Sequence, residues 1–261
     1  MITVSFVIPL FNEEERIEKT FRALETLRMP RGLKLEKIIF VDDGSTDKTF
    51  QKILEFSQKR EKKHAITIIS YKENRGKGNA VRMGMLESNS EYTLFFDADI
   101  STPLVEITKF APFMHQRKPV LIGTRKNGKS TVINHQPVMR EFMGKCFTLL
   151  TQTVLGLDVN DFTCGFKAFS KDAKEIIFSK MQISGWGYDA ELMLLAQQNK
   201  FKIKEIPVIW SNDTGTKVVL YKAIPKSIFE LIKINWIHKT KPASMLVFRP
   251  LFFKIQYRRA Q

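Results

Sequence analysis

Short apolar runs alternate with amphipathic stretches through the first part of the chain. Four runs are rich in β-branched or aromatic residues and predict buried strands, at residues 4–8, 38–41, 66–70 and 92–96. Between them the spacing of apolar residues predicts helices, at residues 13–27, 48–62 and 78–86. This alternation predicts an α/β fold with a mostly parallel sheet and helices on both faces.

The second half of the chain is less regular. Residues 162–169 and 203–210 are compatible with strands, and residues 188–199 predict a helix. We find no internal repeat, low-complexity segment or convincing linker before about residue 216. We therefore predict a single domain over residues 1–216, followed by a distinct segment at residues 217–261.

Three of the four predicted strands end in polar residues. The first ends in the run from Pro9 to Glu13, the second in residues 42–45 (Asp-Asp-Gly-Ser) and the fourth in residues 97–99 (Asp-Ala-Asp). The carboxyl ends of parallel strands meet at one edge of a sheet, where ligands bind in folds of this class. The sequence therefore predicts a binding site at this edge.

Asp97 and Asp99 are the strongest candidates for chemistry. On an extended strand end, residues i and i+2 point the same way, so both carboxylates are expected to face one site. Two hard oxygen ligands at this spacing suit Mg²⁺ or Mn²⁺, which keep waters and bind substrate phosphates. Taken alone, Asp-x-Asp is more often a solvated acidic turn, but its position directly after an apolar strand favours a metal site.

Two further runs are candidates for binding a nucleotide. Asp42 can accept hydrogen bonds from a ribose or a base, whereas Asp47 suits the cap of the helix that follows. The glycine-rich basic run at residues 74–79 opens a helix, and its backbone N–H groups with Lys77 suit a diphosphate. By itself, this run is equally compatible with a flexible loop.

Composition narrows the cellular setting. The two cysteines, Cys146 and Cys164, do not form a disulfide framework, which indicates a reducing compartment. The apolar N-terminus lacks the basic region of a signal peptide, and no apolar stretch is long enough to cross a membrane. We therefore expect a cytoplasmic protein.

The net charge of +15 is concentrated at the C-terminus, where residues 217–261 hold ten Lys and Arg but one acidic residue. A stripe of apolar residues at helical spacing runs through this segment: Ile224, Ile228, Leu231, Ile232 and Trp236. Interleaved apolar and basic residues suit an interfacial segment on anionic lipid. The alternative is a terminal helix packed on the domain, and both apply if the first helix packs and the last residues dock.

Such a basic chain also suggests a nucleic-acid binder. No recognisable RNA or DNA motif accompanies the charge, and attraction to phosphates alone is unspecific. We therefore predict no nucleic-acid partner.

In this order, the polar clusters resemble glycosyltransferase family 2, over about residues 3–218. Within that family, residues 74–78 and 161–167 are similar to the polyprenyl-phosphate branch, first to its dolichyl-phosphate glucosyltransferases and then to its mannosyltransferases. The resemblance implies a GT-A-type, Rossmann-like catalytic domain. It also implies inverting, metal-dependent transfer of a hexose from a nucleotide diphosphate sugar to a polyprenyl phosphate, by a peripheral enzyme at the cytosolic face of a membrane.

The resemblance implies roles for individual residues as well. Asp97 and Asp99 would hold the metal and the diphosphate, and Asp189 matches the catalytic base of related enzymes with hydroxyl acceptors. The remaining residues would bind the donor (Pro9, Glu13, Asp42, Asp43, Lys77, Ala98 and Arg125) or the acceptor phosphate (Arg140 and Lys217). A phosphate acceptor is already anionic, so it needs cations beside it rather than a strong base.

Two departures from the mannosyl enzymes bear on the substrate. Those enzymes carry a third metal ligand, usually Gln, where this chain has Ser101, and an Arg where it has Ser211. The second departure favours UDP-glucose over GDP-mannose as the donor. Two alternatives stay open, a mannosyltransferase that uses GDP-mannose and a family 2 enzyme with a saccharide hydroxyl acceptor, in which Asp189 is the base.

Overall fold

The computed structural model describes residues 1–60, 65–126, 129–134, 138–212 and 220–239, without the side chains of residues 60, 138–140 and 220–225. The strands are β1 (Ile2–Leu10), β2 (Leu33–Asp42), β3 (Ala65–Ser70), β4 (Tyr92–Phe96), β5 (Val120–Thr124), β6 (Thr131–Val132), β7 (Phe166–Ser170), β8 (Ile203–Pro207) and β9 (Ile209–Trp210). The helices are α1 (Ile17–Thr26), α2 (Thr49–Arg60), α3 (Lys77–Glu87), the 3₁₀ turn η1 (Leu104–Glu106), α4 (Ile107–His115), α5 (Val138–Leu155), α6 (Lys171–Lys180), α7 (Tyr188–Gln198) and α8 (Leu220–Lys239).

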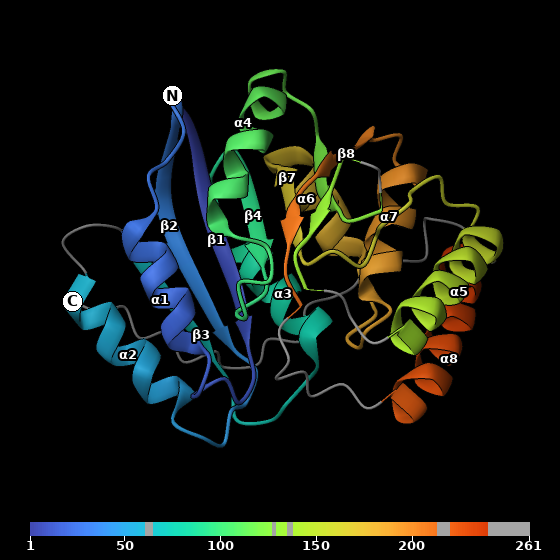
Figure 1. Ribbon diagram of the computed structural model, residues 1–261, viewed down its shortest axis with the longest axis horizontal. Helices are drawn as coiled ribbons and strands as arrows, with labels where there is room; N and C mark the ends of the chain where they lie inside the picture. The colour runs from blue at the N-terminus through green and yellow to red at the C-terminus, as the bar shows by residue number, and fades with distance from the viewer. Residues whose placement is uncertain (61–64, 127–128, 135–137, 213–219, 240–261) are drawn as a thin grey trace.

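Seven strands form one sheet in the order β3-β2-β1-β4-β7-β5-β8 (Figure 1). All of them run parallel except β7, which pairs antiparallel with both β4 and β5. The mostly parallel sheet is therefore confirmed. The carboxyl ends of β1, β2, β4 and β5 lie at one edge, and because β7 runs the other way, the loop that enters β7 reaches the same edge.

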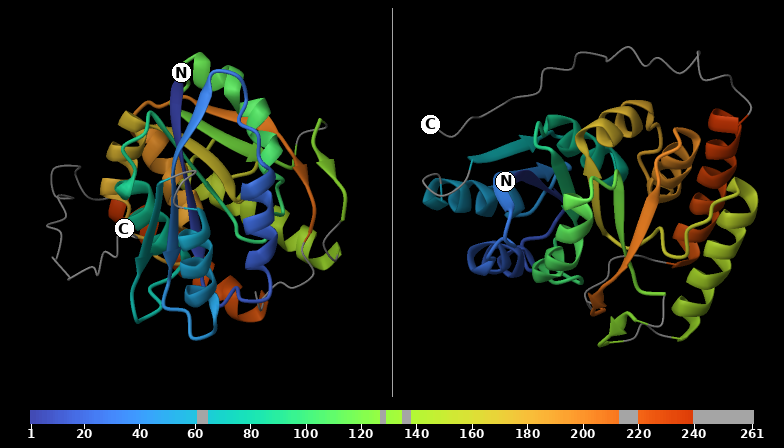
Figure 2. Two further views of the ribbon diagram at one scale, coloured as in Figure 1. Left: turned by 90° about the vertical axis from the view of Figure 1, so that its left-hand side faces the viewer. Right: turned by 90° about the horizontal axis from the view of Figure 1, so that it is seen from above.

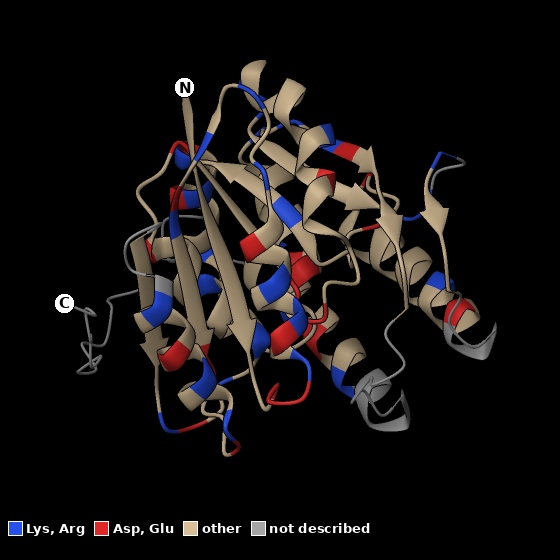
Figure 3. Cartoon of the chain, turned by 60° about the vertical axis from the view of Figure 1, so that its left-hand side comes forward, with Lys and Arg blue, Asp and Glu red and all other residues tan. Residues whose placement is uncertain are grey.

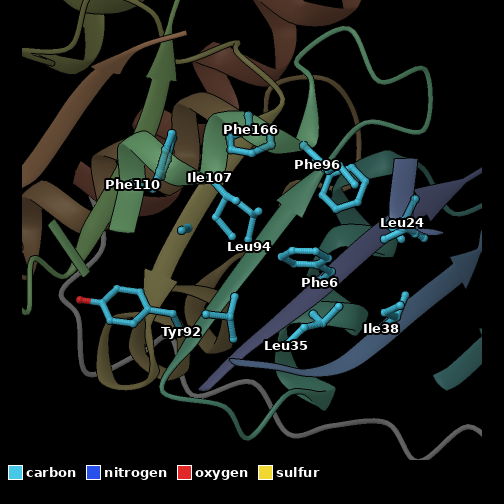
Figure 4. Close-up of a cluster of buried hydrophobic side chains, with 14 of the residues drawn as sticks. Phe6, Leu24, Leu35, Ile38, Tyr92, Leu94, Phe96, Ile107, Phe110 and Phe166 are labelled. Atoms are coloured by element: carbon cyan, nitrogen blue, oxygen red, sulfur yellow. The ribbon is translucent and has the colours of Figure 1, made fainter. Parts of the chain in front are cut away.

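Helices cover both faces of the sheet, as the strand–helix alternation predicts. On one face α1, α2 and α4 pack on alternate side chains of the strands, and Figure 4 shows Phe6 and Leu94 among them. On the other face α3, α6 and α7 pack on a second cluster that includes Val7 and Phe95. Neighbouring residues of a strand point to opposite faces, which explains why Phe6 and Val7 belong to different clusters.

The predicted elements of the first half are confirmed within a few residues. The first helix begins later than predicted, at Ile17, because Asn12 has a left-handed φ of 53° and the chain turns before the helix starts. The predicted strand at residues 203–210 is divided into β8 and β9. β5 was not predicted from the sequence, because its apolar run covers only residues 120–122 and ends at Gly123.

α8 packs beside α5 at one end of the molecule (Figures 1 and 2). Its buried side includes Leu231 and Ile234, which join the core cluster behind α7. This confirms the packed-helix alternative for α8, although residues 220–239 fall in the segment predicted to be distinct. Three residues of the predicted apolar stripe, Ile228, Ile232 and Trp236, lie instead on an exposed side of the helix.

No helix in the described ranges is long and apolar enough to span a bilayer.

Candidate active site

Asp97 and Asp99 lie in the turn that follows β4. The N–H of Ile100 donates to the carbonyl oxygen of Asp97 over 3.2 Å, and Ile100 has a φ of 54°. The expectation that both carboxylates sit on an extended strand end is therefore wrong, because β4 stops at Phe96 and the chain reverses at once. The two carboxylates are nevertheless close: burial raises the pKa of Asp99, and the negative charge of Asp97 raises it further.

Lys77, the first residue of α3, reaches the same turn. Its Nζ lies 2.6 Å from Oδ1 of Asp97 and 5.4 Å from the centre of the Trp186 ring. Burial opposes its charge, but the carboxylates of Asp97, Asp189 and Asp99 together raise the pKa of Lys77 above that of an ordinary lysine. In Figure 3, acidic and basic positions accordingly adjoin one another around the strand ends. The structure thus brings together four of the predicted site residues.

Asp43 holds the loop that delivers Lys77. Its Oδ1 accepts the N–H of Arg75 over 2.8 Å, and its Oδ2 accepts the N–H of Gly76 over 2.9 Å. Asp43 is 2% exposed, so its carboxylate serves the loop, and direct contact with a donor stays a prediction. Gly76 has a φ of 95°, and a Cβ there would overlap the carbonyl oxygen of Ser184, so the loop requires glycine at this position.

The loop before β7 closes the site from the other side. A Cβ on Gly165 would overlap the carboxylate of Asp97, and the carbonyl oxygen of Gly165 accepts the Asp97 N–H over 3.2 Å. The backbone at Gly165 therefore lies directly against the carboxylate of Asp97, and only glycine leaves room for it. This contact arises because β7 lies beside β4 in the sheet.

Asp189 enters the site from the first turn of α7. Its Oδ1 lies 2.6 Å from Nζ of Lys167, a fully buried lysine of β7 that also donates to the carbonyl oxygen of Cys164 over 2.7 Å. Burial raises the pKa of Asp189, while the charges of Lys167 and Lys77 oppose that rise. A buried carboxylate that keeps a cation beside it can fix the orientation of a neighbouring substrate or accept a proton.

Arg125 follows β5, and a buried carboxylate fixes the orientation of its guanidinium. Its Nε and Nη2 donate to the two oxygens of Asp161, each over 2.8 Å, and its guanidinium lies 5.1 Å from the centre of the Trp210 ring. Burial alone would raise the pKa of the Asp161 carboxyl, but the charge and the hydrogen bonds of Arg125 act against burial, and the pKa is lowered. Arg125 is thus pre-oriented at the predicted edge, and its contact with a phosphate stays a prediction.

The other predicted donor residues lie at the ends of β1, β2 and β4. Pro9, Asp42 and Ala98 are buried, and the Asp42 carboxylate accepts the N–H of Ser45 and the hydroxyl of Ser70. Glu13 is ion-paired with Arg16 at 2.7 Å. These residues lie at the predicted edge, but the carboxylates of Asp42 and Glu13 have partners in the protein, and contact of these residues with a donor stays a prediction.

Asp47 accepts the N–H of Thr49, the first residue of α2, over 2.9 Å. This confirms the predicted cap. Of the predicted acceptor residues, the side chain of Arg140 and the whole of Lys217 lie outside the described residues.

The two departures from the mannosyl enzymes are neighbours in space. The N–H of Ser211 donates to the carbonyl oxygen of Ser101 over 2.9 Å, and the N–H of Ser101 donates to Oδ1 of Asp99, also over 2.9 Å. Both departures therefore lie on the side of the site next to Asp99.

Three site residues were given no role in the sequence analysis: Lys167, Asp161 and Trp186. Lys167 carries a detectable signal, because a lysine inside an apolar strand requires a buried counter-charge. Asp161 could be recognised only by its contact with Arg125, which lies 36 residues earlier. Trp186 sits between two glycines, a pattern that does not specify what the ring contacts.

The carboxylates of Asp97 and Asp99 fit a divalent metal ion whose remaining ligands come from a substrate. Within the described residues, no group of three or more His, Cys, Asp or Glu side chains could hold a metal ion by itself. Asp97 and Asp99 supply the hard oxygens that Mg²⁺ and Mn²⁺ prefer, and such ions usually complete their coordination with waters and substrate phosphates. The two carboxylates therefore suit an ion that arrives with a diphosphate.

Comparison with known proteins connects this geometry to a sequence family. The model of the family described as "Glycosyl transferase family 2" matches residues 5–178. The dolichyl-phosphate beta-glucosyltransferase of Saccharomyces cerevisiae is 34% identical over 236 residues, which is 84% of this chain and 70% of that protein. The enzyme of the same name from Homo sapiens is 31% identical over 228 residues, which is 83% of this chain and 69% of that protein.

Among solved structures, the chain is similar to glucosyl-3-phosphoglycerate synthase from Mycobacterium tuberculosis. The complex of that protein with Mn²⁺, uridine diphosphate and phosphoglyceric acid has a TM-score of 0.65 and 19% sequence identity, covering 93% of this chain and 80% of that one. A likeness at this level of identity shows the shared fold, and it confirms the GT-A-type architecture.

Proposed function

This chain belongs to glycosyl transferase family 2, and we propose that it transfers glucose from UDP-glucose to dolichyl phosphate or a similar polyprenyl phosphate. It is a glycosyltransferase. The observation that carries the finer proposal is the cluster of Asp97, Asp99 and Lys77 at the end of β4, in a chain 34% identical to a dolichyl-phosphate beta-glucosyltransferase.

On the donor side, the site must stabilise a departing diphosphate. Asp97 and Asp99 would hold a divalent ion, which when bound neutralises the charge of that leaving group. Lys77 holds Asp97 in place through their 2.6 Å ion pair and presents an ammonium to the same region. In the loop before α3, the N–H groups of Arg75 and Gly76 donate to Asp43 and that of Gly78 donates to Ser184, so the ammonium of Lys77 is the group there that would meet the diphosphate.

On the acceptor side, the nucleophile is a phosphate oxygen. It forms a bond to the anomeric carbon as the bond from that carbon to the diphosphate breaks, so the anomeric centre inverts. No proton has to be removed from the acceptor. The Nε and Nη2 groups of Arg125 donate to Asp161 and Thr163, so the guanidinium would meet the acceptor phosphate with its positive charge and its Nη1 group.

A second candidate function is transfer to a saccharide hydroxyl, and Asp189 favours it. Burial raises the pKa of Asp189, which makes its carboxylate a stronger base than an exposed one. Against this, the Lys167 ammonium already occupies one oxygen of Asp189, which suits a positioning role. In the first function, Asp189 therefore orients the acceptor or the Lys77–Asp97 pair.

We also propose that the protein works as a peripheral enzyme on the cytosolic face of a membrane. Support comes from the "α5–α8 surface", which we define by five apolar side chains that are each more than half exposed: Phe142, Leu149, Phe229, Ile232 and Trp236. Four exposed lysines lie on the same two helices: Lys145, Lys226, Lys233 and Lys239. Exposed apolar side chains with lysines on the same helices suit an anionic bilayer, and the basic residues 240–261 follow α8 directly in the sequence.

A donor screen followed by lipid extraction tests the function. The purified protein is incubated with Mg²⁺ or Mn²⁺, dolichyl phosphate and radiolabelled UDP-glucose or GDP-mannose. We expect label in the organic phase with UDP-glucose and little with GDP-mannose. A water-soluble labelled oligosaccharide, formed when a saccharide replaces the lipid, would favour the second candidate. Preference for GDP-mannose would overturn the choice of sugar.

A further inference from the structure

The start of α7 depends on a carboxylate from another helix. Glu230 of α8 is 8% exposed, and its Oε2 accepts the N–H of Gly187 over 2.7 Å. Gly187 is the residue before α7, which has no side-chain cap of its own. The N-terminus of a helix favours a negative charge, so Glu230 caps α7 from outside its own segment.

Two glycines make room for this carboxylate. A Cβ on Gly185 would overlap Oε1 of Glu230, and a Cβ on Gly187 would lie 3.0 Å from the Cβ of Glu230. The residue between these glycines is Trp186. Glu230 thus presses against the backbone on both sides of Trp186 and restricts where its ring can lie.

The segment that Glu230 holds is in direct contact with the active site. The carbonyl oxygen of Ser184 accepts the N–H of Gly78 over 2.8 Å, at the start of α3, and the Trp186 ring lies 5.4 Å from Nζ of Lys77. Asp189 follows two residues after Gly187. The contacts of Glu230 therefore lead to Lys77 on one side and to Asp189 on the other.

We propose that Glu230 is a positioning residue of this glycosyltransferase, which fixes the segment from Ser184 to Gly187 and thereby sets Lys77 and Asp189 for transfer. Glu230 itself touches no reacting atom. The proposal rests on the proposed function, and it assigns a role in the reaction to α8, which lies beyond the 5–178 family match. Because the outer side of α8 belongs to the α5–α8 surface, the same helix touches both the proposed docking face and the active-site segment.

The experiment compares Glu230→Ala and Glu230→Gln with the native protein. The glutamine has the same size and keeps an oxygen that accepts the Gly187 N–H, whereas alanine removes it. Glu91→Ala is the matched control, because Glu91 also accepts a backbone N–H, that of Thr3 over 3.0 Å, but at the opposite end of the strands. Thermal unfolding of all four proteins shows which variants fold.

Two readouts are measured, kinetics of transfer to the lipid phosphate and fluorescence of Trp186. Subtracting the spectrum of the same protein with Trp186→Phe isolates the Trp186 signal. We expect Glu230→Ala to lower kcat about tenfold, with the KM for UDP-glucose within about twofold, since misplaced catalytic groups cost rate more than donor affinity. Its Trp186 emission should shift, and Glu230→Gln should restore most of both signals.

Equal kcat losses in Glu230→Ala and Glu91→Ala, with Trp186 emission unchanged, would overturn the positioning role. A failure of Glu230→Gln to recover would do the same. If the native protein transfers no sugar to the lipid, the proposed function fails instead. In that case, the Trp186 signal still decides whether Glu230 fixes the segment.

Discussion

The two halves of the molecule neutralise their buried carboxylates in different ways. In the amino-terminal half, from β1 to the turn after β4, Asp42 and Asp43 accept hydrogen bonds from backbone N–H groups and neutral side chains. In the carboxy-terminal half, from β5 to α8, three buried carboxylates meet side chains that carry or can carry a positive charge, in the pairs Arg125–Asp161, Lys167–Asp189 and His238–Glu191, whereas Glu230 accepts a backbone N–H.

This difference has a consequence for mutation. Substitution of a carboxylate that accepts hydrogen bonds from backbone N–H groups removes only those hydrogen bonds. A buried ion pair that loses one partner leaves an uncompensated charge, which costs much more. We therefore expect changes in the first half to affect chemistry before stability, and changes in the second half to affect both.

The largest effect is expected for Asp99→Asn, which tests the first side of the comparison. The change would remove one of the two carboxylates proposed to hold the divalent ion, so transfer should fall by about a thousandfold or more while the protein stays folded. Activity with radiolabelled donor and the midpoint of thermal unfolding check the two parts. Activity that is unchanged, or that persists in excess chelator, contradicts the metal assignment.

The second effect, on stability, is expected for Lys167→Met. It leaves Asp189 buried without its nearest cation, and the free energy of unfolding should fall by about 3–5 kcal/mol. Urea unfolding measures this loss. The double variant Lys167→Met/Asp189→Asn should recover part of it, because the unpaired charge is then gone. If the single variant is as stable as Asp43→Asn in the first half, the comparison between the halves fails.

A smaller, pH-dependent effect is expected for Asp161→Asn. The pKa of Asp161 is lowered in the folded protein, so its pairing with Arg125 stabilises the fold above the ordinary value of 3.8 and is lost as pH falls through the folded pKa. Near neutral pH, the free energy of unfolding of the native protein should exceed that of the variant by about 1–3 kcal/mol. This difference should shrink below pH 3.8, and unfolding at several pH values measures it. A difference independent of pH would contradict the pairing.

The smallest effect on stability is expected on the α5–α8 surface. Ile232→Glu should change the free energy of unfolding by less than about 0.5 kcal/mol, because Ile232 is 61% exposed. It should nevertheless weaken binding to anionic vesicles in a sedimentation assay. Val105→Glu is the control, since Val105 is 58% exposed on η1. Binding of the native protein should fall with salt, because charges are screened within about 8–10 Å at physiological ionic strength. Equal binding by both variants would place the docking face elsewhere.

The sequence predicted the first half well because its signals are local. The apolar runs that form β1 to β4 are bounded by turns, and the carboxylates after them necessarily meet at one edge of a parallel sheet. The positions of Asp42 and Asp97 followed from this rule, whereas Lys77 was predicted from the glycine-rich run that opens a helix. The turn at residues 97–100 did not, since it depends on the left-handed conformation of Ile100.

The second half was harder to predict because its partners are far apart in the chain. Lys167 and Asp189 are separated by 22 residues, and Glu230 acts on a glycine 43 residues earlier. The apolar stripe of α8 was recognised, but the pattern did not indicate which side would be buried. Leu231 packs inward while Ile232, the next residue, faces outward.

The antiparallel strand β7 also determines when the sheet can be completed. β4 pairs with β1 on one side, but its other partner, β7, comes much later in the chain, with Phe96 opposite Phe166 and Tyr92 opposite Ser170. During synthesis, β4 is therefore an unpaired edge until β7 and its flanking loops have emerged, and such an edge is prone to pairing with other chains. Contacts of such long sequence separation slow folding, and the sheet is complete only when this strand from the carboxy-terminal half has paired with β4.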